Sequence, residues 1–256
     1  MRIIACRRLL AFATALWLAW TFSACAAHPP ATLVVHSADA AHCVTPASLD
    51  LHRLLPPFPA VGSQEARGEL DELLRLQAER TAVQVARARA DAEVSVFRFG
   101  DALGSPTAFT AAHLPLTAAL FNAVDEDASA VIGPVKDAFA RPRPFKIEPR
   151  LEPAVPRSGS GSYPSGHAAW AYTAALVLAD MVPERSGQIF ERAREYAHNR
   201  NLGGVHYPSD IEAGHLAATA IAAMLFSCAA FQHDEAAAQA ELRRALALPP
   251  RPGEQQ

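Results

Sequence analysis

The stretch SGSYPSGH, residues 160 to 167, leads directly into an apolar segment from Ala168 to Val182. Proline is favoured at the first position of a helix, because its missing N–H has no partner there and its fixed φ angle already suits a helix. We therefore expect Pro164 to begin a helix, with the backbone N–H groups of Ser165, Gly166 and His167 directed out of its first turn. Such a helix start binds phosphate readily, and Gly166 lets an anion approach without a Cβ in the way. The alternative is an ordinary proline-capped helix with a surface histidine.

Helical periodicity continues on both sides of this segment. Apolar side chains recur at helical spacing in two further stretches, namely Leu116, Leu120, Phe121 and Val124, and then Ile189, Phe190, Ala193, Tyr196 and Ala197. Ser63 and Thr81 suit the capping positions of two earlier helices, the second of which would run toward Val96. The Ala-rich stretch 215–231 is shorter than the roughly 20 residues that span a bilayer, so it predicts a buried central helix. With no alternating strand pattern, the 256 residues predict an all-α, single-domain helical bundle.

Composition divides the chain into four segments. Residues 1–26 begin with arginines, continue with an apolar run and end in small residues, which is the pattern of an export signal. Residues 27–62 are proline-rich with little periodicity, and they predict an extended segment packed on the domain. Residues 63–248 are the expected helical domain, and the polar tail 249–256 is expected to be disordered.

The leader and the cysteines together indicate the compartment. An export signal predicts a periplasmic or secreted protein with no integral membrane span after its removal. Cys25 loosely matches a lipoprotein cleavage site, so a lipid anchor at that cysteine is the alternative. Beyond the leader, Cys43 and Cys228 predict either a disulfide or two unrelated buried thiols. The sequence leaves open whether Ala-rich helices pair between copies in a homo-oligomer.

Charge and histidine spacing argue against two kinds of partner. The formal net charge of -3 and the absence of a long basic run make nucleic acid an unexpected partner. No His-Glu-x-x-His motif is present and most of the ten histidines are scattered, so we expect neither a metal nor another cofactor. We expect solvated roles for His28, His36, His42 and His52, and structural or surface roles for His113, His198, His215 and His233.

A second block of interest is KDAFARPRP, residues 136 to 144. Lys136 belongs to a helical stretch, whereas Pro142 and Pro144 force the chain out of a helix. Arg143 then lies in a stiff extended segment, where its guanidinium is a preorganised ligand for an anion. Solvated surface charge is the alternative for both cations.

The third block is NRNLGGVHYPSD, residues 199 to 210. Two glycines end one helix and Pro208 begins the next, which brings Asp210 into its first turn. Asp210 either complements the helix dipole or accepts the Nδ1–H of His206. In the second case the tautomer of His206 is fixed, and its Nε2 atom is left free as a nucleophile.

The order and spacing of the three blocks resemble the signature of the phosphatidic-acid-phosphatase type 2 superfamily. The GSYPSGH run, the export signal and the chain length further resemble the bacterial class A non-specific acid phosphatases. That resemblance implies an all-helical fold of the acid phosphatase and vanadium haloperoxidase type. Two positions depart from the pattern, since Asn199 stands where the third motif usually has Ser, and Ala168 where class A members often have Thr.

The resemblance also implies a mechanism for the hydrolysis of small phosphate monoesters without a metal. His206 would attack phosphorus to form a phosphohistidine, and His167 would serve as general acid and then as general base. The expected phosphate ligands are Lys136, Arg143, Ser165, Gly166 and Arg200. Vanadate is expected as an inhibitor or transition-state analogue. The alternatives are a vanadium-dependent haloperoxidase, a membrane-bound lipid phosphatase and a non-catalytic phosphate-binding protein of the envelope.

Overall fold

The computed structural model describes residues 42–105 and 107–251. The export signal, Cys25 and the beginning of the proline-rich segment lie outside the described residues, as do His28, His36 and the last residues of the tail. Within the described ranges every regular element is helical and none is a strand, which confirms the all-α class. The α-helices are α1 (Leu51–Leu54), α2 (Gln64–Glu79), α3 (Ala82–Ala90), α4 (Pro115–Phe139), α5 (Pro144–Ile147), α6 (Gly166–Met181), α7 (Ser186–Leu202), α8 (Pro208–Phe226) and α9 (Ala229–Ala245), with short 3₁₀ turns at Val96–Phe99 and Pro183–Arg185.

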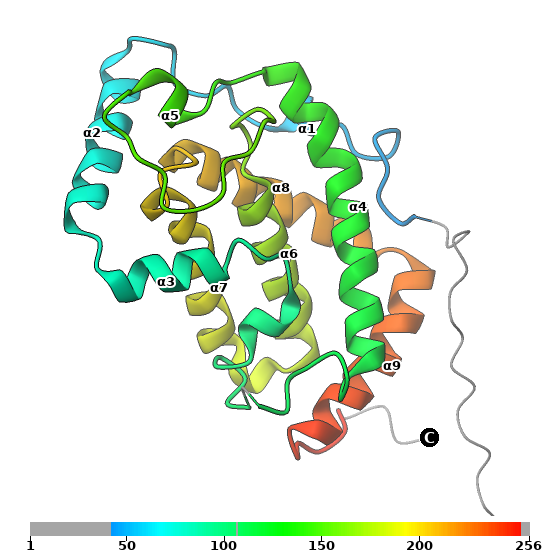
Figure 1. Cartoon of the computed structure of the whole chain (residues 1–256). Coiled ribbons are helices and arrows are strands. Elements are labelled where there is room, and N and C mark those ends of the chain that lie inside the picture. Colours follow the sequence, from blue (N-terminus) through cyan, green and yellow to red (C-terminus); the bar gives the residue numbers. More distant parts are fainter. Residues whose placement is uncertain (1–41, 106, 252–256) are drawn as a thin grey trace, which may run out of the picture. The chain divides into compact units, whose positions relative to one another are not determined.

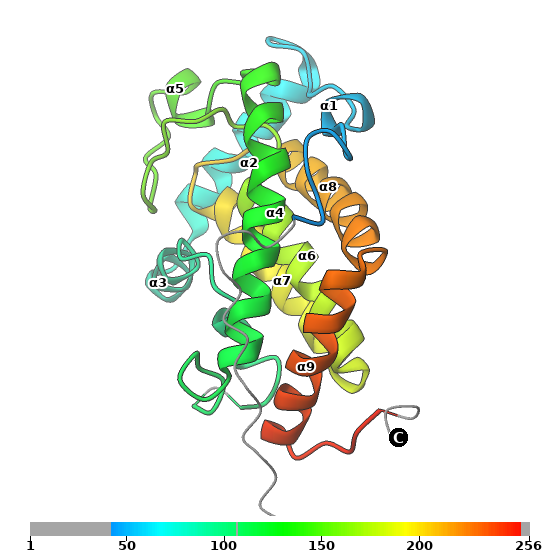
Figure 2. The ribbon, with the colours of Figure 1, turned by 90° about the vertical axis from the view of Figure 1, so that its right-hand side faces the viewer.

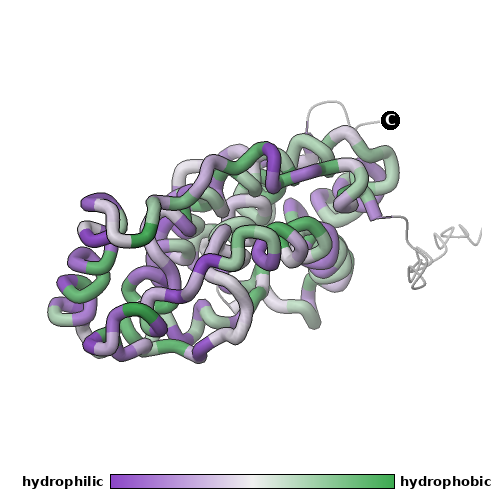
Figure 3. The backbone as a smooth tube through the Cα atoms, turned by 90° about the horizontal axis from the view of Figure 1, so that it is seen from above, coloured by the Kyte–Doolittle hydropathy of each residue, from purple (hydrophilic) through white to green (hydrophobic). Residues whose placement is uncertain are grey.

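Helix α6 lies at the centre of the domain, where it contacts α4, α7, α8 and α9 (Figures 1 and 2). Most of its side chains are buried, in keeping with the apolar run that follows His167. Figure 3 shows hydrophobic and hydrophilic residues interspersed along the backbone. The sequence therefore places its most apolar helix in the core.

Small residues bring α6 and α8 into close contact at their N-terminal ends. A Cβ on Gly214 would lie 2.7 Å from the carbonyl oxygen of Ser165 and 2.8 Å from the Cβ of Ala168, so only glycine fits this crossing. Ala217 and Ala218 are also fully buried on α8. This close crossing matters for function, because it sets the start of α8 against the start of α6.

Two expected helix caps are confirmed, and the expected extents of two helices are wrong. Ser63 and Thr81 cap α2 and α3 through hydrogen bonds from the Ala66 and Gln84 amides, but α3 ends at Ala90 and not near Val96. The apolar stretch 215–231 is not one helix, because α8 ends at Phe226 and α9 begins at Ala229 with a bend of 93° between them. Both helices bury apolar side chains, so hydropathy carries no sign of the change in direction.

The described part of the proline-rich segment is anchored to the domain. Asp127 on α4 accepts hydrogen bonds from the amides of Cys43 and Val44, and its Oδ1 lies 2.7 Å from Nδ1 of His42. His42 therefore has a protein partner, while its side chain stays about half exposed (51%), in keeping with the solvated role expected for it. A disulfide joins Cys43 to Cys228 with the Cα atoms 5.8 Å apart. The segment is not wholly extended, since it contains α1.

At the C-terminal end, the described residues 249–251 contact the domain. The Pro249 carbonyl accepts a hydrogen bond from Arg243, and Arg251 pairs with Asp180 at 2.9 Å. Within the described ranges no single helix has the length and apolar composition to cross a membrane; α8 and α9 meet that test only when taken together across their bend.

Candidate active site

The three sequence blocks meet at the ends of neighbouring helices. Lys136 lies in the last turn of α4, where its Nζ donates to the carbonyls of Gly161 (3.1 Å) and Pro164. Helix α4 stops after Phe139 because Ala140 adopts a left-handed conformation (φ 46°), and the following prolines keep Arg143 extended (φ −71°, ψ 152°). The amide of Ser165 donates to the carbonyl of Asp210 at 2.9 Å, which joins the second block to the third.

His206 lies between a carboxylate and a guanidinium. Its Nδ1 is 3.1 Å from Oδ2 of Asp210, and its Nε2 is 3.0 Å from Nη1 of Arg143. A guanidinium has only donors, so the nitrogen that faces Arg143 must be the acceptor. The hydrogen is therefore on Nδ1 and donates to Asp210, while the lone pair of Nε2 is directed away from the carboxylate. This is the tautomer that a histidine nucleophile requires.

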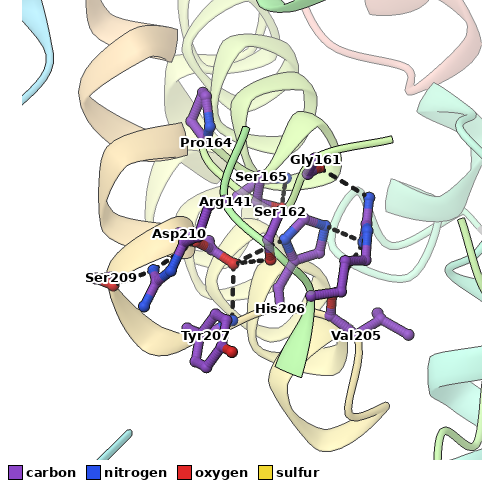
Figure 4. Close-up of polar contacts among 12 residues, drawn as sticks. Arg141, Gly161, Ser162, Pro164, Ser165, Val205, His206, Tyr207, Ser209 and Asp210 are labelled. Carbon is purple, nitrogen blue, oxygen red and sulfur yellow. Dashed lines mark hydrogen bonds and ion pairs between the residues drawn. The ribbon is translucent and has the colours of Figure 1, made fainter. Parts of the chain in front are cut away.

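Asp210 is fully buried, yet it is surrounded by donors (Figure 4). Its Oδ2 accepts from the Tyr207 amide at 2.8 Å and from the Ser162 hydroxyl, and its Oδ1 accepts from Nη1 of Arg141 at 2.7 Å. Burial raises the pKa of this carboxyl, but His206, Arg141 and Ser162 outweigh burial and leave the pKa below its usual value. Asp210 therefore remains a carboxylate in the mildly acid range.

Both histidines of the site are held neutral in the free protein. Burial lowers the pKa of His206 to about 3, although Asp210 opposes that shift. The pKa of His167 is lowered to about 4 by burial and by the positive charge of Arg200. Any anion in the site would counter these shifts, because it compensates the charge of an imidazolium.

Three cations, Lys136, Arg143 and Arg200, lie near the imidazoles of the site. Burial and the charge of Arg143 lower the pKa of Lys136 to about 8, so the ammonium is still charged at neutral pH. Arg143 also donates from Nε to the Ser160 carbonyl at 3.0 Å and from Nη2 to Ser160 and Gly161 at 3.3 Å. The 3.3 Å contacts are the weakest of these hydrogen bonds, so an anion can replace them at the smallest loss.

The remaining residues of the site are held by a turn at the end of α3, residues 91–93, which we call the Asp91 turn. Nε2 of His167 lies 3.2 Å from the Ala92 carbonyl, and Nη1 of Arg200 donates to the Asp91 carbonyl at 2.9 Å. The hydroxyl of Tyr196 donates to the next carbonyl, that of Glu93. Three successive carbonyls of this turn therefore contact His167, the general acid expected from the sequence, Arg200, an expected phosphate ligand, and the phenol of Tyr196.

The carboxylate of Asp91 is itself held by cations and by Asn199. It accepts from Arg192, from Nε of Arg98 at 3.1 Å and from Nδ2 of Asn199 at 2.8 Å. Asn199 is the residue that departs from the usual Ser of the third motif. The longer Asn side chain thus links α7 to the Asp91 turn.

The expected start of α6 needs a correction. The helix begins at Gly166, with Ser165 as its N-cap accepting from the Ala168 amide at 3.2 Å, and Pro164 follows a cis peptide bond outside the helix. The Ser165 amide is paired with Asp210 and is not directed at an anion. The amides of Gly166 and His167 are the first two of the helix, and they retain the anion-binding position.

Sequence reasoning missed four residues that shape this site: Glu69, Asp91, Arg141 and Ser162. Arg141 could have been found, since it belongs to the RPRP run that also contains Arg143. Glu69 and Asp91 lie far from the three blocks in the sequence, on α2 and after α3, and no local pattern distinguishes them from surface acids. Within 42–105 and 107–251, no group of three or more His, Cys, Asp or Glu side chains could hold a metal ion.

Comparison with known proteins identifies relatives of this chain. A non-specific acid phosphatase of Providencia stuartii is 31% identical over 223 residues, which cover 81% of this chain and 86% of the relative. An acid phosphatase of Zymomonas mobilis is 34% identical over 118 residues, or 44% of this chain and 45% of the relative.

Among solved structures, a bacterial vanadium-dependent iodoperoxidase has the same fold with a TM-score of 0.54. The two are 19% identical, and the match covers 68% of this chain and 52% of the peroxidase. The family model described as PAP2 superfamily matches residues 111–234, the range that contains all three blocks. This chain belongs to the PAP2 superfamily.

Proposed function

We propose that this chain is an exported acid phosphatase that hydrolyses small phosphate monoesters through a phosphohistidine on His206. As a relative of non-specific acid phosphatases in the PAP2 superfamily, it is a phosphoric monoester hydrolase. The observation that carries the mechanism is the pair of contacts at His206. Asp210 holds Nδ1 and only a donor faces Nε2, so the lone pair of Nε2 is the nucleophile.

In the first step, Nε2 of His206 forms a bond to phosphorus as the bond from phosphorus to the ester oxygen breaks. The leaving oxygen takes a proton from His167. Nε2 of His167 faces the Ala92 carbonyl, which can only accept, so that nitrogen carries a hydrogen and Nδ1 is the atom available for proton transfer. Lys136, Arg143 and Arg200, with the amides of Gly166 and His167, stabilise the charge on the equatorial oxygens.

In the second step, water attacks phosphorus and its proton goes to His167. The bond between phosphorus and Nε2 breaks, which releases inorganic phosphate and regenerates the neutral imidazole of His206. Asp210 stabilises the positive charge on His206 in both steps. The cations supply the charge compensation that a metal provides in other phosphatases, so we expect activity to be unchanged by EDTA. We also expect vanadate to inhibit competitively, because it can take the geometry of the transferred phosphoryl group.

Export and the compartment are part of this proposal. The leader at residues 1–26 supports a periplasmic or secreted enzyme, and the disulfide between Cys43 and Cys228 suits an oxidising compartment. The mass of the mature amino terminus distinguishes plain cleavage from acylation at Cys25.

The pH dependence follows from the two neutral histidines. Because His167 is neutral well above its pKa of about 4, the proton for the leaving group arrives with the substrate monoanion, whose second pKa is about 6. Binding then moves that proton to His167. We predict that kcat/KM falls above about pH 6 and that this limb follows the second pKa of the ester when substrates of different acidity are compared. A limb that stays fixed for all esters would assign the proton to the enzyme instead.

The function itself is tested by phosphate release from p-nitrophenyl phosphate, with wild type and His206→Ala measured side by side. We expect turnover only in wild type, together with an acid-labile phosphoenzyme after rapid quenching. His113→Ala is the matched control, because His113 is exposed and its Nδ1 lies 3.1 Å from the hydroxyl of the nearby Thr110. Equal turnover in wild type and His206→Ala would refute the mechanism. Halide oxidation with peroxide and vanadate, without phosphate release, would identify a haloperoxidase. Phosphate binding without turnover, in both wild type and His206→Ala, would identify a binding protein.

A further inference from the structure

Arg141 bridges two buried carboxylates, those of Asp210 and Glu69, on the Nδ1 side of His206. Its Nη1 donates to Oδ1 of Asp210 and to the Ser209 hydroxyl, and its Nη2 donates to Oε2 of Glu69, each at 2.7 Å. The side chain of Arg141 is 4% exposed, that of Glu69 8% and that of Asp210 0%. A series of contacting side chains of alternating charge therefore runs from Glu69 on α2 through Arg141 to Asp210, and it ends at the imidazole of His206.

Glu69 and Arg141 are each fixed by further contacts. Oε1 of Glu69 accepts from the Ser209 amide at 2.7 Å, so Glu69 also caps the first turn of α8. The guanidinium carbon of Arg141 lies 3.8 Å from the centre of the Tyr207 ring and 4.9 Å from that of Phe58, with the two rings acting as cation–π partners. Neither side chain can turn away without losing several contacts, and Asp210 is held in one orientation relative to Nδ1.

The charges of Arg141 and Glu69 act on His206 in opposite directions. Arg141 disfavours a positive imidazole and makes Asp210 less basic, whereas Glu69 offsets part of the charge of Arg141. The other titratable groups that face His206 are Lys136 and Arg143, and the phenols of Tyr163 and Tyr207 lie near Asp210. Glu69 is therefore the carboxylate that balances the cation behind Asp210.

We propose that Arg141 and Glu69 are positioning residues for the nucleophile: Arg141 orients Asp210 toward Nδ1 of His206, and Glu69 offsets the charge of Arg141 so that Asp210 still stabilises the imidazolium. This inference rests on the proposed phosphatase function. It makes Arg141 distinct from Arg143, since Arg141 acts through Asp210 and does not touch the substrate.

The test is the acid limb of kcat/KM for p-nitrophenyl phosphate in wild type, Arg141→Met and Glu69→Gln. That limb reports protonation of His206 in the free enzyme. We expect Arg141→Met to move it to higher pH by about one unit, and Glu69→Gln to move it to lower pH by a few tenths of a unit, because the two variants remove charges of opposite sign. Arg141→Lys keeps the charge and should restore most of the wild-type limb. Shifts in the same direction, or no shift in Arg141→Met, would overturn the proposal.

A control separates this role from a loss of stability. Arg243→Met removes another buried arginine, one that binds Glu184 at 2.7 Å and the Met181 carbonyl at 3.1 Å, on the α9 side of the domain. We expect it to lower the melting temperature without moving the acid limb. If Arg243→Met moves the limb as far as Arg141→Met does, the shift reflects destabilisation and the proposal fails.

A second readout does not depend on turnover. The ¹⁵N chemical shifts of the His206 ring report which nitrogen carries the hydrogen. We expect Nδ1–H alone in wild type and a mixture of tautomers in Arg141→Met, in which Asp210 has lost its orienting partner. If wild type shows no turnover, the proposed function fails while this measurement still decides the positioning role, and an unchanged tautomer in Arg141→Met then refutes it.

Discussion

Two fully buried aspartates, Asp210 and Asp91, support the two halves of the site in different ways. Asp210 contacts the proposed nucleophile itself, with its carboxylate against Nδ1 of His206. Asp91 contacts Arg200 through its carbonyl, and the carbonyl of the following residue contacts His167. A carboxylate carries a full charge that stabilises a positive imidazole strongly, whereas a neutral carbonyl fixes the tautomer and the position of the ring but stabilises the positive form only weakly. In the proposed mechanism, the half that forms the covalent bond thus has the stronger electrostatic support, and the half that transfers protons is mainly held in position.

Breaking the Asp210 contact should have the largest effect on catalysis. In Asp210→Asn the side-chain amide can donate toward Nδ1, which favours the tautomer with hydrogen on Nε2 and removes the lone pair of the nucleophile. We expect kcat to fall by about 10³ to 10⁴, the size seen when the carboxylate partner of a catalytic histidine is replaced. Single-turnover formation of the phosphoenzyme measures this step directly. A loss smaller than tenfold would mean that Asp210 serves mainly to stabilise the start of α8.

Removing the proton donor should cost less, and the cost should depend on the leaving group. For His167→Asn we expect kcat/KM, which reports the first step alone, to fall by roughly 10² to 10⁴ on an alkyl phosphate. The loss on p-nitrophenyl phosphate should be much smaller, because p-nitrophenolate leaves without needing a proton. The ratio of the two losses, measured with the same enzyme preparation, is the decisive quantity. If both esters lose equally, His167 binds phosphate and does not act as the acid in the first step.

Asp91→Asn tests the positional half of the comparison. The substitution keeps the backbone carbonyls in place but removes the negative charge between Arg98 and Arg192. We expect a fall of about tenfold in kcat/KM, expressed mainly in KM because Arg200 loses its fixed position, together with a lower melting temperature from the unbalanced buried arginines. The tautomer of His206 should not change. A change at His206 similar to that in Asp210→Asn would show that the two halves are not independent.

The sequence predicted the parts of this site that lie on helix ends. Pro142, Pro144 and Pro208 restrict the backbone locally, so the positions of Arg143 and Asp210 followed from neighbouring residues. The start of α6 was misjudged, because Pro164 is compatible with the first turn of a helix and nothing local shows that Ser165 is the cap. Glu69 and Asp91 could not be predicted, since their roles arise only when α2 and α3 pack against α7 and α8. Local backbone constraints can be predicted from the sequence, whereas a buried ion pair between residues about 100 positions apart, such as Asp91 and Arg192, can be recognised only in the folded structure.

The smallest effect is expected at Asn199. A substitution there tests the Asp91 half of the site without removing a charge. In Asn199→Ser the usual residue of the motif is restored, but the hydroxyl is too short to maintain the 2.8 Å hydrogen bond from α7 to the Asp91 carboxylate. We expect stability to fall by about 1 kcal/mol and KM to rise only a few-fold, because the Asp91 carbonyl still holds Arg200. Urea unfolding and steady-state kinetics measure the two effects separately. Combining Asn199→Ser with Asp91→Asn should cost less than the sum of the single changes, since both break the same contact. Fully additive losses would instead mean that Asn199 acts independently of the Asp91 turn.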